Sequence, residues 1–268
     1  MTRRIAFVGG GNMAYALATR LAQRTYDVVV SEPIAEQRAR FGPPVSTTPD
    51  NTVAVRGAST VVLAVKPQVL ETVVREIAPG IRDDQLVVSI AAGVPMAAIE
   101  QWLGNGRALV RCMPNTPALV GAGISGLIAN AAVTTDQRNE AETILRVAGE
   151  VVWFDTDTDL DAVTALSGSG PAYFFAVIEA LAAAGTNIGL DPETAKRLVV
   201  ATARGAAIMA TGDDPAELRA RVTSPGGTTA RALSILGERS FSESLDAAVR
   251  GAFERSRELA RELSGDPG

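Results

Sequence analysis

The sequence contains no histidine and only one cysteine among its 268 residues. Histidine is the commonest general acid–base side chain and the commonest metal ligand, so this chain lacks the usual residue for both roles. The single cysteine, Cys112, rules out an internal disulfide and, without histidine, nearly excludes a zinc site. We therefore expect no bound metal and a reducing, cytoplasmic setting.

The chain also lacks an excess of basic over acidic residues and has no long apolar runs. The net charge of −5 leaves nothing to offset the negative charge of a nucleic acid or an anionic membrane. The best candidate for a membrane span, residues 171–190, is interrupted by Glu179, Thr186 and Asn187. The apolar run that follows the N-terminal arginines, IAFV, is too short for a signal peptide. We expect a soluble protein with no nucleic-acid or membrane partner.

The first half alternates short apolar runs with helical patterns. The predicted strands are Ile5–Val8, Asp27–Ser31, Thr60–Val65, Leu86–Ile90 and Ala108–Cys112, with Gly121–Ile128 and Glu150–Phe154 as further strands. The predicted helices between them are Asn12–Gln23, Ile34–Phe41, Gln68–Ile77 and Pro95–Leu103. This alternation predicts an α/β domain over residues 1–157, a Rossmann-type doubly wound parallel sheet.

The second half changes in character near Asp155. The acidic segment DTDTDLD (155–161) could cap a helix or link two domains, and no convincing strand follows it. The predicted helices are Ala172–Ala184, Pro192–Thr211, Pro215–Val222, Thr229–Leu236 and Phe241–Leu263. The last of these alternates charges, which is typical of a solvated face. We expect an all-α domain over residues 158–268.

A glycine motif follows the first predicted strand. Residues 9–14, GGGNMA, match G-x-G-x-x-A between a strand and a helix. In this motif the first glycine makes the tight turn, Gly11 lets the backbone approach a pyrophosphate, and small Ala14 lets the helix pack on the strand. The helix start then offers free N–H groups to the phosphates. The motif in this position predicts dinucleotide binding.

Two charged residues follow the next strands. Glu32 ends the second strand, where a carboxylate suits the ribose 2′-hydroxyl of NAD and repels the 2′-phosphate of NADP. The alternatives are that Ser31 donates to a phosphate there, or that Glu32 is a solvated loop carboxylate. Lys66, stiffened by Pro67, could meet the cofactor or a substrate carboxylate, or lie merely exposed.

Two loops follow the later strands. In SIAAGV (89–94), the small residues Ala91 and Ala92 would leave room for a nicotinamide ring. In RCMPNTPALVGAG (111–123), two prolines bracket Asn115 and make a rigid loop with a polar tip. For each, loop geometry alone is the alternative explanation.

The helical half contains two glycine-rich segments before predicted helix starts, ALSGSGPAYFF (165–175) and SPGGTT (224–229). A glycine loop that leads into a helix can bind an anion through backbone N–H groups without an arginine. Each could also be a plain turn between helices, and Thr229 could merely cap its helix. Two such loops in a histidine-free, dinucleotide-binding chain favour binding of a substrate carboxylate.

These motifs together resemble the pyrroline-5-carboxylate reductase family. The resemblance spans nearly the whole chain and rests on FVGGGNMA, AVKPQ, SIAAGV, RCMPNTP, AVTALSGSGPAYFF and RVTSPGGTT, in the order and spacing of the family. SGSGPAY and SPGGTT are specific to the family, whereas the glycine fingerprint is not. The resemblance implies reduction of 1-pyrroline-5-carboxylate to L-proline with NADP(H) or NAD(H). It also implies a helical domain that intertwines with a partner subunit, in a homodimer at least, with a higher assembly such as a decamer left open.

The resemblance and the residue patterns together give the expected site. The expected cofactor-binding residues are Val8, Gly9, Gly10, Gly11, Asn12, Met13, Ser31, Glu32, Asn51, Ala64, Val65, Lys66, Pro67, Ala91, Ala92 and Asn115. The expected substrate-binding residues are Ser169, Gly170, Ser224, Gly226, Gly227, Thr228 and Thr229, with Thr229 also expected to be catalytic. The choice between NADPH and NADH stays open.

Three other functions are alternatives to this one. A β-hydroxyacid dehydrogenase shares the two-domain plan but uses a lysine in its helical domain, and Lys196, the one lysine of the second half, lacks a G-x-x-x-K pattern. Another imine reductase and a non-catalytic dinucleotide sensor are the remaining alternatives. An imine nitrogen arrives protonated or takes its proton from a hydroxyl or water, so its reduction fits a chain without histidine.

Overall fold

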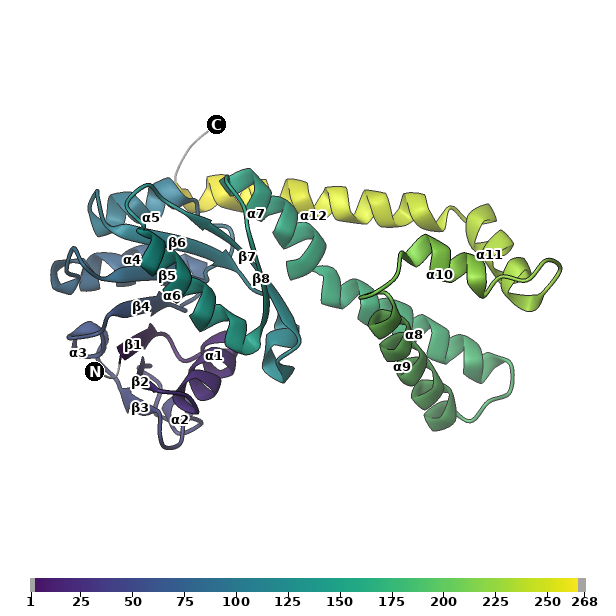
Figure 1. The fold of residues 1–268 in the computed structure, drawn as a ribbon, viewed down its shortest axis with the longest axis horizontal. Coiled ribbons are helices and arrows are strands. Elements are labelled where there is room, and N and C mark those ends of the chain that lie inside the picture. The colour runs from purple at the N-terminus through teal and green to yellow at the C-terminus, as the bar shows by residue number, and fades with distance from the viewer. Residues whose placement is uncertain (1–2, 265–268) are drawn as a thin grey trace. The chain divides into compact units, whose positions relative to one another are not determined.

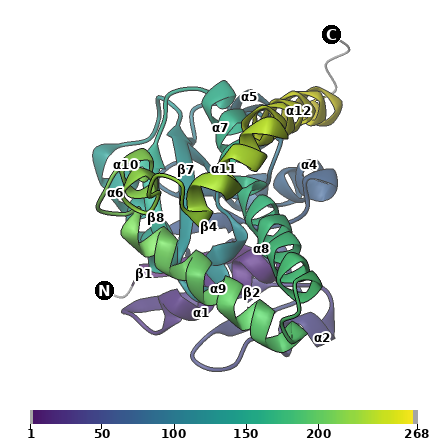
Figure 2. The same ribbon diagram turned by 90° about the vertical axis from the view of Figure 1, so that its right-hand side faces the viewer.

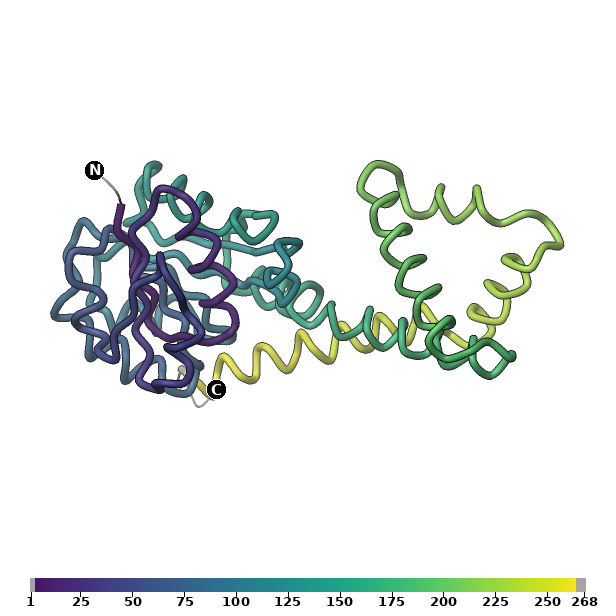
Figure 3. The backbone as a smooth tube through the Cα atoms, turned by 90° about the horizontal axis from the view of Figure 1, so that it is seen from below, coloured from purple at the N-terminus to yellow at the C-terminus, as the bar shows by residue number. Residues whose placement is uncertain are grey.

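The computed structural model describes residues 3–264, so the outer ends of the two predicted domains, residues 1–2 and 265–268, lie outside the described residues. The chain forms two compact units (Figure 1). The first contains the residues up to Ser169 together with those from Ala252 onward, and the second contains residues 170–251. The last helix therefore begins in the second unit and ends in the first, as the chain trace shows (Figure 3).

The first unit is built on an eight-stranded sheet of order β3-β2-β1-β4-β5-β6-β7-β8. The strands are β1 Arg3–Val8, β2 Tyr26–Ser31, β3 Ser46–Thr48, β4 Thr60–Leu63, β5 Leu86–Ser89, β6 Ala108–Met113, β7 Gly123–Ala129 and β8 Gly149–Trp153. The first six are parallel, β7 is antiparallel to β6, and β8 is parallel to β7. The predicted Rossmann-type sheet is confirmed, although β3 was not predicted and the last two strands reverse direction.

Helices cover both faces of this sheet because its strands are apolar on both sides. The helices are α1 Asn12–Ala22, α2 Ala35–Arg38, α3 Asn51–Val55, α4 Pro67–Ile77, α5 Met96–Leu103, α6 Thr135–Leu145 and α7 Asp157–Val163. Along β1, Ile5 and Phe7 pack in one core with α1 and α6, and Ala6 and Val8 pack in the other with α3, α4, α5 and α7. Neither α3 nor α6 was predicted, although Thr134 and Gln137 form a capping box at the start of α6.

One helical stretch runs from Asp157 to Asn187 through α7, the π-helical segment Thr164–Gly168 and α8 (Gly170–Asn187). Thr156 and Asp159 form a capping box at its start, so the acidic DTDTDLD segment caps a helix, one of its two predicted roles. The predicted glycine loop over SGSG is wrong. Ser169 N donates to Thr164 O five residues back, so the segment stays helical as a π-bulge, a feature frequent at functional sites.

The second unit contains helices only, as predicted. They are α8, α9 Pro192–Met209, α10 Pro215–Arg221, α11 Thr228–Glu238 and the first part of α12 Phe241–Ser264. Asp191 and Asp214 cap α9 and α10, each followed by proline at the first helical position. The helices α8 and α9 lie side by side (Figure 2). Phe174 and Ile188 are 72% and 83% exposed in the single chain, so this unit does not bury its own apolar surface.

By length and composition alone, the 31-residue stretch Asp157–Asn187 is the one candidate for a membrane span within the described part of the chain. A single such helix is weak evidence, since a helix that packs against other protein passes the same test.

The end of α12 packs within the first unit. Ser256 is 3% exposed, and its Oγ donates to Asp161 Oδ1 of α7 at 2.7 Å. Leu259 and Leu263 face the loop after β5, where a Cβ on Gly93 would lie 3.6 Å from each. The charged face of α12 is exposed as predicted, and this buried face was missed.

We expect Ser256→Ala to lower the free energy of unfolding by about 1–3 kcal/mol, because it leaves the Asp161 carboxylate without its hydrogen-bond donor. Ser244→Ala on the same helix removes an exposed hydroxyl and should cost less than about 0.5 kcal/mol. Urea denaturation at one fixed protein concentration measures both. Equal stability of the two variants would contradict the docking of α12 described here.

Candidate active site

The predicted cofactor residues lie at one edge of the sheet. The fingerprint loop follows β1, Glu32 follows β2, Ala64–Pro67 follows β4, and Ala91 and Ala92 follow β5. These strands are parallel, so their carboxyl ends share an edge, and the strand order reverses between β1 and β4. Ligands of doubly wound sheets bind at this switch point.

The fingerprint loop has no room for side chains at its first two glycines. Gly9 has φ +102° and its N–H donates to Ser31 O at 2.9 Å, and an added Cβ would lie 2.7 Å from Ala64 O. At Gly10 an added Cβ would lie 2.9 Å from Glu32 Cβ. The loop is therefore fixed between the segments that follow β2 and β4.

Gly11, in contrast, faces open space, with no atom within 4 Å of where its Cβ would be. It is the N-cap of α1, so no side chain caps that helix. The first N–H groups of a helix have no partner within the helix, and an uncapped helix start is a site for phosphate. Asn12 is exposed and Met13 half-buried beside it, so this surface fits the pyrophosphate of a dinucleotide.

Glu32 is a buried, hydrogen-bonded carboxylate at the end of β2. It is 7% exposed; its Oε2 accepts from Gly10 N at 2.9 Å and its Oε1 from Ile34 N at 3.0 Å. The alternative that it is a solvated loop carboxylate is wrong. Ser31 is fully buried and its Oγ donates to Phe7 O at 3.3 Å, so its side chain does not face a phosphate in this structure.

Two other predicted cofactor residues begin helices. Lys66 is the exposed N-cap residue of α4, and Pro67 is its first residue. Asn51 is the first residue of α3, and its Nδ2 donates to Glu76 Oε2 at 3.1 Å. Both residues follow a strand at the edge that holds the fingerprint.

Asn115 has internal partners. Its Oδ1 accepts from Ile124 N at 3.0 Å, and its Nδ2 donates to the carbonyl and hydroxyl oxygens of Ser167, each at 3.3 Å. The side chain ties the loop after β6 to β7 and to the π-helical segment. Contact of Asn115 with a cofactor stays a prediction.

An ion pair at the same edge was missed by the sequence analysis. The largely buried side chain of Arg111, near the end of β6, pairs with Asp157 in the first turn of α7. The Asp157 carboxylate also accepts from Met96 N, at 3.1 and 3.3 Å, where α5 begins. The pair joins three elements next to the Ala91–Val94 loop. An arginine within the otherwise apolar strand ALVRCM was the signal that could have revealed it.

The single cysteine does not supply a nucleophile. Burial raises the pKa of the Cys112 thiol to about 12, so the thiol is protonated at neutral pH. No group of histidine, cysteine or acidic side chains able to hold a metal occurs among residues 3–264.

In the second unit, SPGGTT forms the turn that leads into α11. Gly227 N donates to Ser224 O at 3.0 Å, Gly226 has φ +71°, and Gly227 is the N-cap of α11. A glycine cap provides no side-chain acceptor, so the N–H groups of the first turn stay available for an anion.

The two threonines follow directly. Thr228 and Thr229 are the first and second helical residues, exposed and half-buried respectively. The alternative that Thr229 caps the helix is therefore wrong. Ser169 and Gly170 lie in the helical stretch Asp157–Asn187, where α8 begins. The prediction had placed them in a loop.

Comparison with known proteins identifies relatives along the whole chain. Residues 157–259 match the family model for pyrroline-5-carboxylate reductase dimerisation, and residues 4–93 match that for NADP oxidoreductase, coenzyme F420-dependent. The pyrroline-5-carboxylate reductase of Pseudomonas aeruginosa is 47% identical over 98% of each chain.

Solved structures give the same result. That of a pyrroline-5-carboxylate reductase from Coxiella burnetii has a TM-score of 0.91 at 40% identity and covers 97% of this chain and 99% of its own. That of the Plasmodium falciparum enzyme with NADP bound has a TM-score of 0.87 at 30% identity, covering 96% and 98%. The chain therefore belongs to the pyrroline-5-carboxylate reductase family.

Proposed function

We propose that this protein reduces 1-pyrroline-5-carboxylate to L-proline with NADH or NADPH as the hydride donor. The observation that carries the proposal is the full-length similarity to relatives of that one name, combined with a dinucleotide fingerprint at the switch point of the sheet. The β-hydroxyacid dehydrogenase alternative has no such support, and Lys196 lies on α9 beside apolar residues.

The first unit supplies the cofactor site. A bound reduced nicotinamide would supply a hydride to the imine carbon. The uncapped start of α1 holds the pyrophosphate, and Glu32 accepts from the ribose. Ala91 and Ala92 leave space for the ring, and the Arg111–Asp157 pair joins the start of α5, which follows their loop, to β6 and α7.

The SPGGTT turn supplies the substrate site. The N–H groups of Thr228 and Thr229 bind the carboxylate at the start of α11, and Gly227, the N-cap residue, shapes the turn through its own N–H bond to Ser224 O. The Thr229 hydroxyl faces the ring nitrogen, which arrives protonated or takes a proton from that hydroxyl or from water. Ser169 and Gly170 at the π-bulge complete the proposed substrate residues.

Cofactor absorbance tests this proposal. The protein is incubated with NADPH or NADH and the cyclic imine, and proline is identified in the product. Parallel reactions contain a β-hydroxyacid with the oxidised cofactor, or an acyclic imine with the reduced one. Proline formation supports the proposal, whereas oxidation of the hydroxyacid alone, reduction of the acyclic imine alone, or binding without turnover overturns it.

Thr229→Ala should lower kcat/KM for the imine roughly 10- to 150-fold, because a hydrogen bond to a charged group contributes about 1.5–3 kcal/mol. Thr229→Ser keeps the hydroxyl and should keep most of the activity. Thr228→Ala should cost less, since we assign only its backbone to the carboxylate. Cofactor affinity should not change in any of the three variants. Normal turnover by a folded Thr229→Ala variant would remove Thr229 from the site.

We expect measurable use of both cofactors, and Glu32→Ser should shift the ratio of kcat/KM values toward NADPH, because it removes a negative charge next to the 2′-phosphate. Steady-state kinetics with each cofactor measure this ratio. An unchanged ratio in the variant would show that Glu32 does not contact the ribose.

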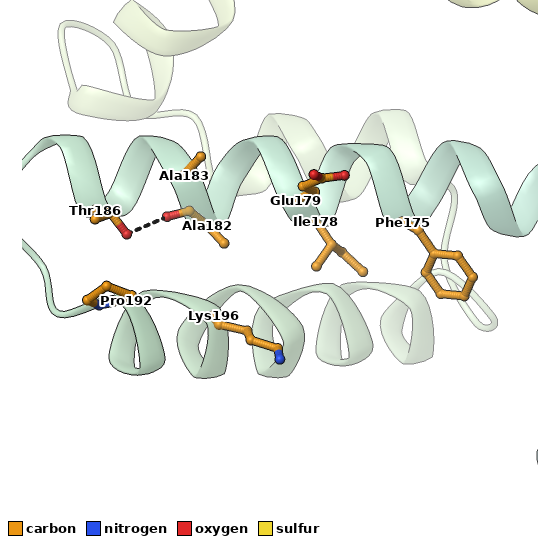
Figure 4. A pocket seen from close by; sticks show the side chains of 8 residues that line it. All are labelled: Phe175, Ile178, Glu179, Ala182, Ala183, Thr186, Pro192 and Lys196. Carbon is orange, nitrogen blue, oxygen red and sulfur yellow. Dashed lines mark hydrogen bonds between the residues drawn. The ribbon is translucent and has the colours of Figure 1, made fainter.

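We further propose that the protein is a cytoplasmic homodimer at least. We also propose that the cofactor-binding domain ends at residue 157 and that the dimerisation and substrate domain begins at residue 158. A groove of about 430 Å³ lies between α8 and α9, and Figure 4 shows the side chains of both helices that line it. Its apolar residues include Phe175 and Ile178, with Glu179 and Lys196 as the charged members. The dimerisation model covers this region, so we propose that a second copy of the chain covers its apolar surface.

Light scattering should find no monomer of the native protein at low concentration. Leu181→Arg, on a 54% exposed position of α8, should give monomers or aggregates, because a charge cannot be buried unpaired in an apolar interface. Gln101→Arg, an exposed position of α5 outside the dimerisation match, is the matched control and should leave the dimer intact. An active, well-behaved native monomer would refute the proposed dimer.

A further inference from the structure

Two arginines follow the β2 strand near the fingerprint loop, and neither figured among the expected site residues. Arg38 Nη1 donates to the carbonyl oxygens of Glu32 and Pro33, at 2.6 and 2.8 Å. Arg38 is therefore half-buried and holds the turn that carries Glu32. Arg40 is exposed, and its Nη2 donates to Asn12 Oδ1 at 3.0 Å.

The side chain of Arg40 packs over an aromatic ring, which in turn packs on a second one. Its guanidinium lies 5.1 Å from the centre of the Tyr15 ring, within the range of a cation–π contact. The Tyr15 ring packs at 5.4 Å from that of Phe41, which is buried in the core. Because Asn12 and Tyr15 lie in the first turn of α1, this contact places a cation beside the proposed pyrophosphate site.

Glu32 and Arg40, the two opposite charges beside the fingerprint loop, differ in their exposure to solvent. The Glu32 carboxylate is withdrawn beneath the loop, and each oxygen accepts a hydrogen bond from a backbone N–H. Arg40 carries the opposite charge on the exposed side. Glu36 on α2 is also exposed, and Arg40 is hydrogen-bonded directly to Asn12 of the fingerprint.

We propose that Arg40 binds the 2′-phosphate on the adenosine ribose of NADPH, and so lets this chain accept the phosphorylated cofactor although it carries Glu32. A guanidinium pairs with a phosphate through charge-assisted hydrogen bonds that a ribose hydroxyl does not offer. To make that contact, Arg40 exchanges its neutral acceptor, Asn12 Oδ1, for the phosphate oxygens. The inference rests on the proposed cofactor site but not on the identity of the substrate.

Calorimetric titration tests the assignment without turnover. The dimeric wild-type protein and its Arg40→Ala variant are titrated with NADPH and NADH, and with the fragments adenosine 2′,5′-bisphosphate and adenosine 5′-phosphate. The affinity of Arg40→Ala for NADPH and for the bisphosphate should fall roughly tenfold or more. Its affinity for NADH and the monophosphate should stay within about twofold, and its NADPH affinity should depend less on salt.

Arg138→Ala is the matched control. Arg138 also lies over an aromatic ring, that of Trp153 at 3.8 Å, but on α6 and away from the fingerprint. This variant loses the same charge and the same type of contact and should bind all four ligands normally. Arg40→Lys keeps a charge without the planar fork and should fall between the native protein and Arg40→Ala.

Unchanged NADPH affinity in Arg40→Ala, or an equal loss for NADPH and NADH, would overturn the assignment; the second result would mean that Arg40 supports the pyrophosphate or the loop. If the protein binds both cofactors as described but does not reduce the cyclic imine, the proposed reaction fails and the assignment of Arg40 stands.

Discussion

The backbone of Gly9 lies so close to the Ala64 carbonyl that no side chain fits between them. Through this contact the loop after β1 packs against the loop after β4. The start of α1, which no side chain caps, therefore lies at the carboxyl edge of the sheet. The same loop brings Gly10 N–H onto the Glu32 carboxylate. The proposed cofactor site is thus made largely of backbone, and its shape depends on positions where only glycine fits.

The reaction we propose does not require a histidine or a cysteine. The chain has no histidine, and its one thiol is buried and protonated at neutral pH. To reduce an imine, the protein must orient two molecules and bind the negatively charged carboxylate of the substrate. It does not need to remove a proton from a hydroxyl group. We assign both anionic groups, the pyrophosphate and the carboxylate, to helix starts whose N-cap residue is a glycine and that no side chain caps, at Gly11 and Gly227.

Local patterns predicted the sheet and most helices, because buried parallel strands are apolar runs and aspartate–proline pairs mark helix starts. They missed β3, a short edge strand of polar residues, and the π-bulge, because serine and glycine favour a loop when read locally. The buried face of α12 and the Arg111–Asp157 pair depend on partners far along the chain. The predicted cofactor residues follow strands whose carboxyl ends share one edge, while the inward turn of Ser31 and the internal bonds of Asn115 depend on side-chain packing.

The most direct test of the account follows the hydride itself. The protein is incubated with the cyclic imine and a reduced nicotinamide cofactor that carries deuterium on its transferable position, and the proline formed is examined by mass spectrometry and NMR. The account predicts one deuterium per proline, on the ring carbon that was double-bonded to nitrogen, with one cofactor oxidised for each proline. Unlabelled proline, or oxidised cofactor without proline, would contradict it.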